Sequence, residues 1–445
     1  MSAGQLPAPT VRGWCHADFD AELLALIGRR RGGGRRGPHR LAALLDELGE
    51  PRVRPEVIKV VGTDGKTSVA HLLEALLTAT GRRVGATTSP HLERIDERIR
   101  IDAGVASPQR LGPAVRCVRD AVARLEAFPS PATSSGGLPA GERLSFFEVI
   151  TAIALQAFAD AQVDLAVVEA GIGGSGDATA ALPAPVTVLT PVGLDHPQLG
   201  ATLAEVAREK AGVLPVGGTL VSAPQTEQVD AVLAAIVAER GGRWLRSGVD
   251  HGVIERYPDE HGQTITLLGP GGATLQVWLP LWGVHQAENA ATALAALHAA
   301  LGGWPAPQLI RAGLAQVAVP GRTESLVRAG RPEVVLDGAH DGPALAALIA
   351  ALAERPVEGD TVVLLGVSGG RDLTAFERRL RAVSADIGYL DTQVGDAEVA
   401  AALTAAEARA GALGRIVVTG SFHLVGAVRA WLGEVDGASD VERRS

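Results

Sequence analysis

A lysine, two glycines and three hydroxyl side chains stand close together in the run GTDGKTS, which begins at Gly62. Gly62 and Gly65 allow a tight turn of the backbone, and Thr67 or Ser68 can cap a helix that follows. The first turn of a helix offers unpaired N–H groups and the positive end of its dipole, and Lys66 adds a full charge beside them. We therefore expect this loop to bind phosphate groups.

A strand and a helix must hold this loop in place. Residues 57–61 (VIKVV) form a β-branched run of the kind found inside a parallel sheet, and residues 69–77 repeat apolar side chains at helical spacing. Val60 occupies the position at which the commoner GxxxxGK loop has its first glycine. The alternative, a glycine turn with a surface lysine, is disfavoured by the strand before the loop and the helix after it.

Polar side chains also follow three later strands. Ser89 follows one strand in the run SPHL, Glu169 ends a second, and His196 follows a third in LDH. The carboxyl ends of parallel strands meet at one edge of a sheet, where α/β enzymes bind their ligands. Glu169 beside a phosphate loop suits Mg²⁺, which takes one or two carboxylates plus phosphate oxygens. A single histidine is more often structural, but strands that deliver Lys66, Glu169 and His196 in order favour a shared site.

The order of these segments predicts an α/β protein with two domains. Residues 1–318 are expected to form a parallel-sheet domain with a phosphate loop, which finishes in short strands over residues 219–280 and a helix over residues 286–301. The run VPGRTE, residues 319–324, indicates a linker. Beyond it, residues up to 445 predict a smaller parallel α/β domain, with strands at residues 333–336, 361–365, 387–390 and 416–418. A site in the cleft between two hinged domains is expected.

Length and composition restrict the class of protein. A chain of 445 residues, 47% hydrophobic and 20% charged, is long enough for two or three globular domains. No apolar run reaches the roughly 18 residues that a membrane span needs, and the N-terminus lacks a signal-peptide pattern. Two cysteines are too few for a disulfide framework or a cysteine metal cluster. We expect a cytoplasmic protein without a membrane partner.

Charge argues against nucleic acid as a partner. The net charge of −9 disfavours broad nucleic-acid binding, although the run RRRGGGRR, residues 29–36, is a local exception. Its three glycines disfavour a helix that would place the arginines on one face, so a solvated loop is the favoured interpretation. A contact to the anionic tail of a substrate is the alternative interpretation.

Ten motifs in order resemble those of folylpolyglutamate synthase and the bifunctional dihydrofolate synthase, the folate branch of the Mur ligases. The resemblance runs from about His39 to Val425 and comprises GTDGKTS, TTSPHLERIDERIRI, LSFFEV, VVEAGIGG, LDH, REKAGV, ENAATALAAL, PGR, LDGAHD and GSFH. It implies the Mur ligase architecture, with ATP and the acceptor bound by residues 1–318 and glutamate bound by a Rossmann-like domain at residues 319–445. It also implies an ATP-dependent amide ligase that adds L-glutamate to a folate or dihydropteroate through an acyl phosphate. The resemblance further favours a monomer that uses Mg²⁺.

The resemblance assigns roles residue by residue. The nucleotide is expected at the phosphate loop and at three later positions, namely Gly62, Thr63, Asp64, Gly65, Lys66, Thr67, Ser68, Asn289, Arg322 and Asp337. Mg²⁺, at two sites, is expected at Ser89, Glu169, His196 and Lys210, and catalysis at Lys66, Glu169, His196 and Lys210. The substrates are expected at Ser145, Phe146, Phe147, Glu148, Gly176, Asp177 and Ala178 for the pterin, and at His340 and Ser421 for the incoming glutamate.

Lys210 illustrates what the resemblance adds. Its spacing alone predicts an ordinary surface charge on a helix. In the family the matching lysine is carried as a carbamate, which turns a cation into an anion suited to a second Mg²⁺. A carbamate on Lys210 is therefore implied by the resemblance only.

Four positions depart from the family pattern. Asp64 and Asp341 stand where the family has asparagine, Ser175 stands where it has arginine, and Ala180 where it has asparagine. These changes cluster around the acceptor pocket, so the ligase chemistry is better supported than the folate substrate. A paralogue that couples an amino acid to a non-folate aromatic carboxylate remains the alternative. A nucleotide-binding protein without ligase activity is disfavoured, because the four catalytic residues are retained.

Overall fold

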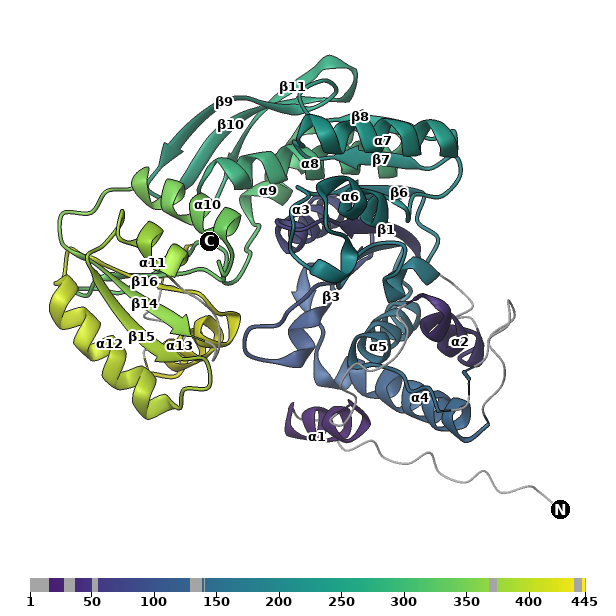
Figure 1. Cartoon of the computed structure of the whole chain (residues 1–445), viewed down its shortest axis with the longest axis horizontal. Helices are drawn as coiled ribbons and strands as arrows, with labels where there is room; N and C mark the ends of the chain where they lie inside the picture. The colour runs from purple at the N-terminus through teal and green to yellow at the C-terminus, as the bar shows by residue number, and fades with distance from the viewer. Residues whose placement is uncertain are drawn as a thin grey trace.

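The computed structural model describes residues 16–27, 37–49, 55–128, 138–139, 141–367, 374–435 and 442–444. Figure 1 shows two α/β units side by side, with a small three-stranded sheet above the space between them. This arrangement confirms the predicted α/β fold with a large parallel-sheet unit and a smaller second one. The basic run at residues 29–36 lies outside the described residues. No described helix is long and apolar enough to cross a membrane.

The first unit is built on a sheet of eight strands in the order β4-β3-β2-β5-β1-β6-β7-β8. Its central strand, β1, pairs in parallel with β5 and β6, while β3 and β4 run antiparallel at one edge. The bounds are β1 Glu56–Val61, β2 Val84–Thr87, β3 Ile99–Ile101, β4 Gly104–Val105, β5 Leu165–Glu169, β6 Val186–Leu189, β7 Thr219–Ser222 and β8 Arg243–Arg246. Because β1, β2, β5 and β6 are parallel neighbours, the loops after them meet at one edge of the sheet.

Helices cover both faces of this sheet. One core lies between the sheet and α3, α8 and α9, a second between the sheet and α1, α2, α4 and α5, and a third between the sheet and α6 and α7. The bounds are α1 His16–Ile27, α2 His39–Glu47, α3 Lys66–Ala79, α4 Pro108–Ala127, α5 Phe146–Asp160, α6 Leu203–Ala211, α7 Glu227–Arg240, α8 Val284–Leu301 and α9 Pro307–Ala315. The helix α5 begins where it does because Ser145 and Glu148 form a reciprocal capping box.

The β-rich stretch at residues 219–280 divides between two sheets. β7 and β8 extend the main sheet, whereas β9 Gly252–Asp259, β10 Gly262–Gly269 and β11 Ala273–Leu279 form a separate antiparallel sheet. The inner face of this small sheet packs on α8 and α9 and shares the core of α3. The stretch therefore braces the helix of the phosphate loop from behind.

The second unit carries a six-stranded sheet in the order β15-β14-β16-β13-β12-β17. Its strands and helices are β12 Glu324–Val327, β13 Glu333–Leu336, α10 Gly342–Ala353, β14 Thr361–Val367, α11 Thr374–Leu380, β15 Asp386–Asp391, α12 Asp396–Ala410, β16 Arg415–Thr419, α13 Phe422–Val435 and β17 Glu442–Arg444. The four parallel strands occur where the sequence predicts them. The antiparallel strands β12 and β17 were not predicted, and β12 begins at Glu324, the last residue of the expected linker.

Candidate active site

The phosphate loop joins β1 to α3 through two glycines in unusual conformations. Gly62 has φ +145°, and a Cβ atom there would lie 1.9 Å from Thr190 Oγ1. Gly65 caps α3 with φ +80°, and a Cβ atom there would lie 2.7 Å from Asn289 Oδ1. Both positions therefore require glycine, because a side chain would collide with a neighbouring residue and because other residues are strained at these positive φ angles. The close approach also places Asn289, on α8, beside the loop.

Lys66 lies against the loop that it follows. Its Nζ donates to the carbonyls of Gly62 at 3.2 Å and Thr63 at 2.9 Å. Thr63 in turn joins the loop to the segment after β6, because the Gly193 N–H donates to Thr63 Oγ1 at 2.9 Å. The cation is thus held at the first turn of α3, next to the N–H groups expected to bind phosphate.

Glu169 lies at the carboxyl end of β5 and connects two other segments of the site. Its side chain is buried, Thr67 Oγ1 lies 3.1 Å from its Oε2, and the Ser89 N–H donates to Oε2 at 3.0 Å. Burial raises the pKa of the Glu169 carboxyl, while the charge of nearby Lys66 opposes that rise. The structure therefore brings together Lys66, Ser89 and Glu169, which lie far apart in the sequence.

Hard oxygen atoms at this edge fit a magnesium ion in part. Glu169 offers a carboxylate, the hydroxyl of Thr67 lies beside it, and the backbone carbonyl of Ser89 lies beside that hydroxyl. In the described ranges no group of three or more His, Cys, Asp or Glu side chains is placed to hold a metal ion. His196 lies in the loop after β6 with its Nε2 3.9 Å from Asp195 Oδ2. Mg²⁺ commonly takes few protein ligands and completes its shell with phosphate and water oxygens, which this donor set allows.

Lys210 is buried, contrary to the surface position that its spacing predicts. Its side chain is 1% exposed, and its Nζ donates to the Gly62 carbonyl at 2.6 Å and to Asp195 Oδ2 at 3.4 Å. Burial, then the charge of Lys66, lowers the pKa of the Lys210 amine to about 8. The reason is that α6 packs beneath the phosphate loop. As an ammonium, Lys210 is a donor and not a metal ligand, so the carbamate stays a prediction.

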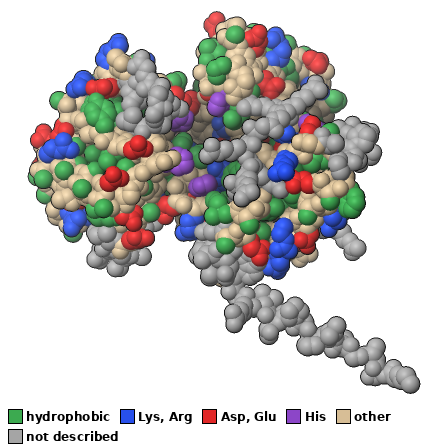
Figure 2. Space-filling view, turned by 60° about the horizontal axis from the view of Figure 1, so that its bottom comes forward, with side chains coloured by type: hydrophobic (Ala, Val, Ile, Leu, Met, Phe, Trp, Pro, Cys, Tyr) green, Lys and Arg blue, Asp and Glu red, His purple; other side chains and the backbone are tan. Residues whose placement is uncertain are grey.

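The second unit presents the start of α10 to the phosphate loop. Burial, followed by the nearby charge of Asp341, raises the pKa of the Asp64 carboxyl to about 6. Asp341 caps α10, since its Oδ1 accepts from the Ala344 N–H at 2.9 Å. Aspartate and asparagine cap helices about equally well, which explains why this departure from the family pattern is tolerated. Figure 2 shows the hollow between the two units, with histidine side chains gathered along it.

Phe422 holds two of the predicted site residues and was not itself predicted. The Arg322 guanidinium lies over the Phe422 ring at 4.2 Å, and the His340 ring meets the same ring edge-on at 5.5 Å. Burial lowers the pKa of Arg322, whereas the charges of Asp337 and Glu169 oppose that change. The only signal for Phe422 in the sequence is its place in GSFH. The ring connects the expected nucleotide and amino-acid positions.

Two further predicted residues serve the backbone of the second unit. Asp337 accepts from the Thr323 N–H at 2.7 Å and from the Ala339 N–H at 2.8 Å. Ser421 Oγ accepts from the His423 N–H at 3.2 Å, at the start of α13. These contacts fix the turns at the carboxyl ends of β13 and β16, so the two turns lie together at the edge that faces the first unit.

The predicted acceptor residues form two tightly braced segments. At the start of α5, Glu148 is buried, pairs with Arg40 at 2.8 Å and accepts from the Ser145 N–H at 2.6 Å. The Arg98 guanidinium lies 4.9 Å from the centre of the Phe146 ring. A Cβ atom on Gly171 would lie 3.0 Å from the Phe147 ring, so the glycine-rich turn packs directly on this ring.

Glu209 braces the glycine-rich turn from α6. It accepts from the Gly176 N–H at 2.7 Å and the Ser175 Oγ at 2.5 Å. Asp177 accepts from the Thr179 N–H at 2.9 Å and from Ile172 at 3.0 Å. The bracing residue Glu209 adjoins Lys210, and sequence reasoning missed it because its partners lie more than thirty residues away.

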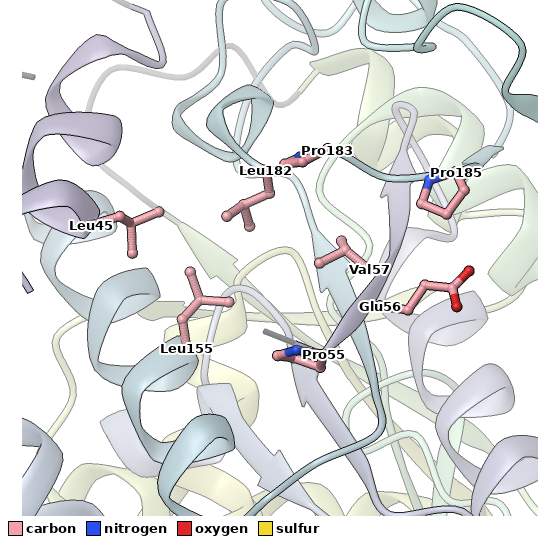
Figure 3. Close-up of a pocket in the computed structure, with 8 residues that line it drawn as sticks. All are labelled: Leu45, Pro55, Glu56, Val57, Leu155, Leu182, Pro183 and Pro185. Carbon is pink, nitrogen blue, oxygen red and sulfur yellow. The ribbon is translucent and has the colours of Figure 1, made fainter. Parts of the chain in front are cut away.

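An apolar pocket lies elsewhere in the first unit. Figure 3 shows its lining, which comes from Leu45, Pro55, Glu56, Val57, Leu155, Leu182, Pro183 and Pro185. It opens at the beginning of β1, whereas the phosphate loop follows the end of that strand. The pocket is therefore separate from the candidate active site.

Known proteins resemble this chain in both sequence and structure. A dihydrofolate synthase/folylpolyglutamate synthase of Mycobacterium tuberculosis is 40% identical over 355 residues, which cover 77% of this chain and 72% of that protein. A folylpolyglutamate synthase of Lacticaseibacillus casei is 37% identical over 351 residues, covering 78% and 79%. The structure of M. tuberculosis folylpolyglutamate synthase complexed with ADP matches with a TM-score of 0.81 at 34% identity, over 94% of this chain and 99% of that one. No protein-family model matches the chain.

A phosphate loop with a buried glutamate beside it, faced by a second α/β unit, defines an ATP-dependent ligase of the Mur ligase fold. The sequence identity of the relatives, and the share of this chain that they cover, identify the family within this class. The chain belongs to the folylpolyglutamate synthase and dihydrofolate synthase family.

Proposed function

We propose that the protein joins L-glutamate to a folate or to dihydropteroate in a reaction driven by ATP and Mg²⁺. The observation that carries this proposal is the cluster of Lys66, Thr67, Ser89 and Glu169, faced across the hollow by Asp341 at the start of α10. A structure described as an FPGS–AMPPCP–folate complex matches this chain with a TM-score of 0.80 at 34% identity. That likeness supports a nucleotide in the first unit and a folate as acceptor.

The chemistry proceeds in two steps. The acceptor carboxylate attacks the γ-phosphorus of ATP, and the bond from that phosphorus to the β–γ bridging oxygen breaks. ADP departs, and the acceptor is converted to an acyl phosphate. The amine of glutamate then attacks the acyl carbon, loses a proton and expels inorganic phosphate, which leaves an amide. Lys66 stabilises the charge that spreads over the transferred phosphoryl group. A bound Mg²⁺, held by Glu169 with Thr67 and Ser89, would neutralise phosphate charge.

The second unit binds the glutamate whose amine attacks the acyl phosphate. His340 and Ser421 stand at adjacent strand ends of its sheet, and their turns face the phosphate loop. The Arg322 guanidinium lies near Asp337 of the second unit and Glu169 of the first, and we assign Arg322 and Asp337 to the nucleoside of ATP. We assign the acceptor to the first unit, between the start of α5 and the turn at Gly176–Ala178, and assign a monomer as the active form.

The main test is a requirement for both substrates. ADP formation should depend on a carboxylate acceptor, and an amide product with the mass of one added glutamate should depend on L-glutamate as well. ATP turnover that needs neither substrate would contradict a ligase. A screen of acceptors by product mass also separates folates from other aromatic acids.

The departures at Ser175 and Ala180 favour an acceptor site with relaxed selectivity. The Ser175 hydroxyl donates to Glu209, and the side chain of Ala180 has no polar atom. Up to two polar partners that arginine and asparagine would supply to the acceptor are therefore missing. An unmatched buried polar group costs roughly 1–3 kcal/mol. A pocket whose polar groups pair with those of the substrate therefore rejects analogues that lack the matching groups. We expect less discrimination against p-aminobenzoyl-glutamate than in a protein that has both residues.

The acceptor prediction is tested with one double variant. Ser175→Arg with Ala180→Asn should raise the ratio of kcat/KM for dihydropteroate to that for p-aminobenzoyl-glutamate, by about tenfold per restored polar contact. The new arginine would stand beside Glu209, which gives it a half-buried carboxylate as a partner. A native enzyme that already prefers dihydropteroate by several orders of magnitude, together with an unchanged ratio in the variant, would place these positions outside the acceptor site.

A further inference from the structure

The segment at residues 89–97 runs from the phosphate site to the second unit. At its start, the Ser89 N–H donates to Glu169 Oε2 at 3.0 Å, and the Ser89 carbonyl lies 3.1 Å from Thr67 Oγ1. Only three residues later, Leu92 packs against the hydrophobic core of the second unit. The segment therefore touches the reacting end of the first unit and the interior of the other one.

Leu92 sits in a recess that exists because two residues of the second unit are glycines. A Cβ atom on Gly321 would lie 2.9 Å from Leu92 Cδ1, and one on Gly426 would lie 2.1 Å from the Leu92 carbonyl oxygen. Gly426 lies within α13, where glycine is unfavourable for a helix and so has a packing reason. The fit leaves no room for a side chain at either position.

An ion pair ties the next residue to the same helix. Arg429 on α13 donates from Nη1 to Glu93 and from Nε to both oxygens of Glu324 at 3.0 Å. All three side chains are largely buried, with 15%, 19% and 5% of Arg429, Glu93 and Glu324 exposed. Charge-assisted hydrogen bonds shielded from water hold their geometry more firmly than surface pairs.

The segment itself is stiffened by one carboxylate. Glu97 accepts from the Leu92 N–H at 2.8 Å, from Glu93 at 3.2 Å and from Arg94 at 3.0 Å. Three backbone donors on one side chain fix the turn that carries Leu92 and Glu93. A displacement of the second unit is therefore passed to Ser89 as a movement of one rigid turn.

We propose that Leu92 and Arg429 are positioning residues for the transfer of the acyl group to glutamate, and that they hold the amino-acid unit at a fixed distance from the phosphate loop. This inference rests on the proposed function, because it assigns a task to each unit. Neither residue touches the reacting atoms. Their loss should leave ATP and the acceptor bound, but should misplace the amine relative to the acyl phosphate.

A second ion pair between the units provides a matched control. Arg256 on β9 pairs with Glu354, just after α10, with Nη1 2.9 Å from Glu354 Oε2. This pair also joins the two units, but among the described residues Arg256 bonds to Gln263 and Glu354 and not to residues 89–97. If any loss of contact between the units had the same effect, Arg256→Met would match Arg429→Met.

The test compares Leu92→Ala, Arg429→Met and Arg256→Met in the full chain. ADP and amide product are measured together with ATP, dihydropteroate and L-glutamate present. In the first two variants we expect a higher KM for glutamate and amide formation lowered by up to about 100-fold, the cost of a misplacement of about 1 Å. ADP should exceed amide, because water then opens the acyl phosphate to carboxylate and phosphate. Leu92→Met should restore coupling, and Arg256→Met should keep ADP and amide equal.

Other outcomes overturn the inference. Two results would refute a specific positioning role for Leu92 and Arg429. One is an equal fall in ADP and amide formation in Leu92→Ala and Arg429→Met, and the other is the same uncoupling in Arg256→Met. If wild type forms no amide at all, the proposed function fails, and docking is then measured by hydrogen exchange at the amides of Leu92 and Glu93. Faster exchange in Arg429→Met than in Arg256→Met supports a specific dock, and equal exchange refutes it. Arg429→Met also serves if Leu92→Ala does not fold.

Discussion

Replacing Asp64 with asparagine is expected to stabilise the protein in a way that depends on pH. Burial, followed by the neighbouring Asp341, raises the pKa of the Asp64 carboxyl from 3.8 to about 6. A carboxyl with a raised pKa in the folded state destabilises that state once it ionises. The penalty is therefore negligible below about pH 3, grows as the pH rises from there towards 6, and is complete above about pH 7.

The size of the effect follows from the same shift. The difference between 6 and 3.8 is about 2 pKa units, which corresponds to about 3 kcal/mol at 1.36 kcal/mol per unit. Asp64 is partly exposed, so water reduces the effect, and we expect about 1–3 kcal/mol above pH 7. Asparagine keeps the shape of the side chain without its charge. Near pH 4.5 the gain should fall to about a third of its value at pH 8.

Urea unfolding of the unliganded protein, followed by far-UV circular dichroism at pH 4.5 and pH 8, measures this gain. Asp341→Asn is the matched control, because asparagine still caps α10 while the neighbouring charge is removed. It should give a smaller gain with the same dependence on pH. A gain in Asp64→Asn that is equal at the two pH values, or no gain at pH 8, would refute the assignment of a half-buried carboxylate repelled by Asp341.

Three substitutions test the catalytic assignments. Lys66→Ala should lower kcat by about 100-fold or more, the usual cost of losing one electrostatic contact to the transition state, with an unchanged circular dichroism spectrum; near wild-type turnover at saturating ATP would contradict it. Glu169→Gln keeps the shape but loses the anion, so Mg²⁺-dependent activity should be lost, and comparable activity at ordinary Mg²⁺ would identify another ligand. Lys210→Ala should be severely impaired and partly recovered by added acetate. Mass measurements that find an unmodified amine in fully active enzyme would end the carbamate hypothesis.

Much of the fold was predictable because it depends on local patterns. The β-branched run before Gly62 and the helical spacing after it predict β1 and α3, and the structure has both. The four parallel strands of the second unit were predicted for the same reason. The strands β12 and β17 were missed, since short antiparallel edge strands depend on their neighbours more than on a pattern of their own.

The candidate site was predictable only as a set of segments. The sequence by itself determined the phosphate loop, because glycines with positive φ and a following helix are local properties, and it placed Glu169 at a strand end. Only the tertiary structure decided that Lys210 is buried beneath the loop, that Asp64 faces Asp341, and that Leu92 enters the second unit. Burial and charge repulsion depend on groups brought together from distant parts of the chain, and no local pattern of residues encodes those distances.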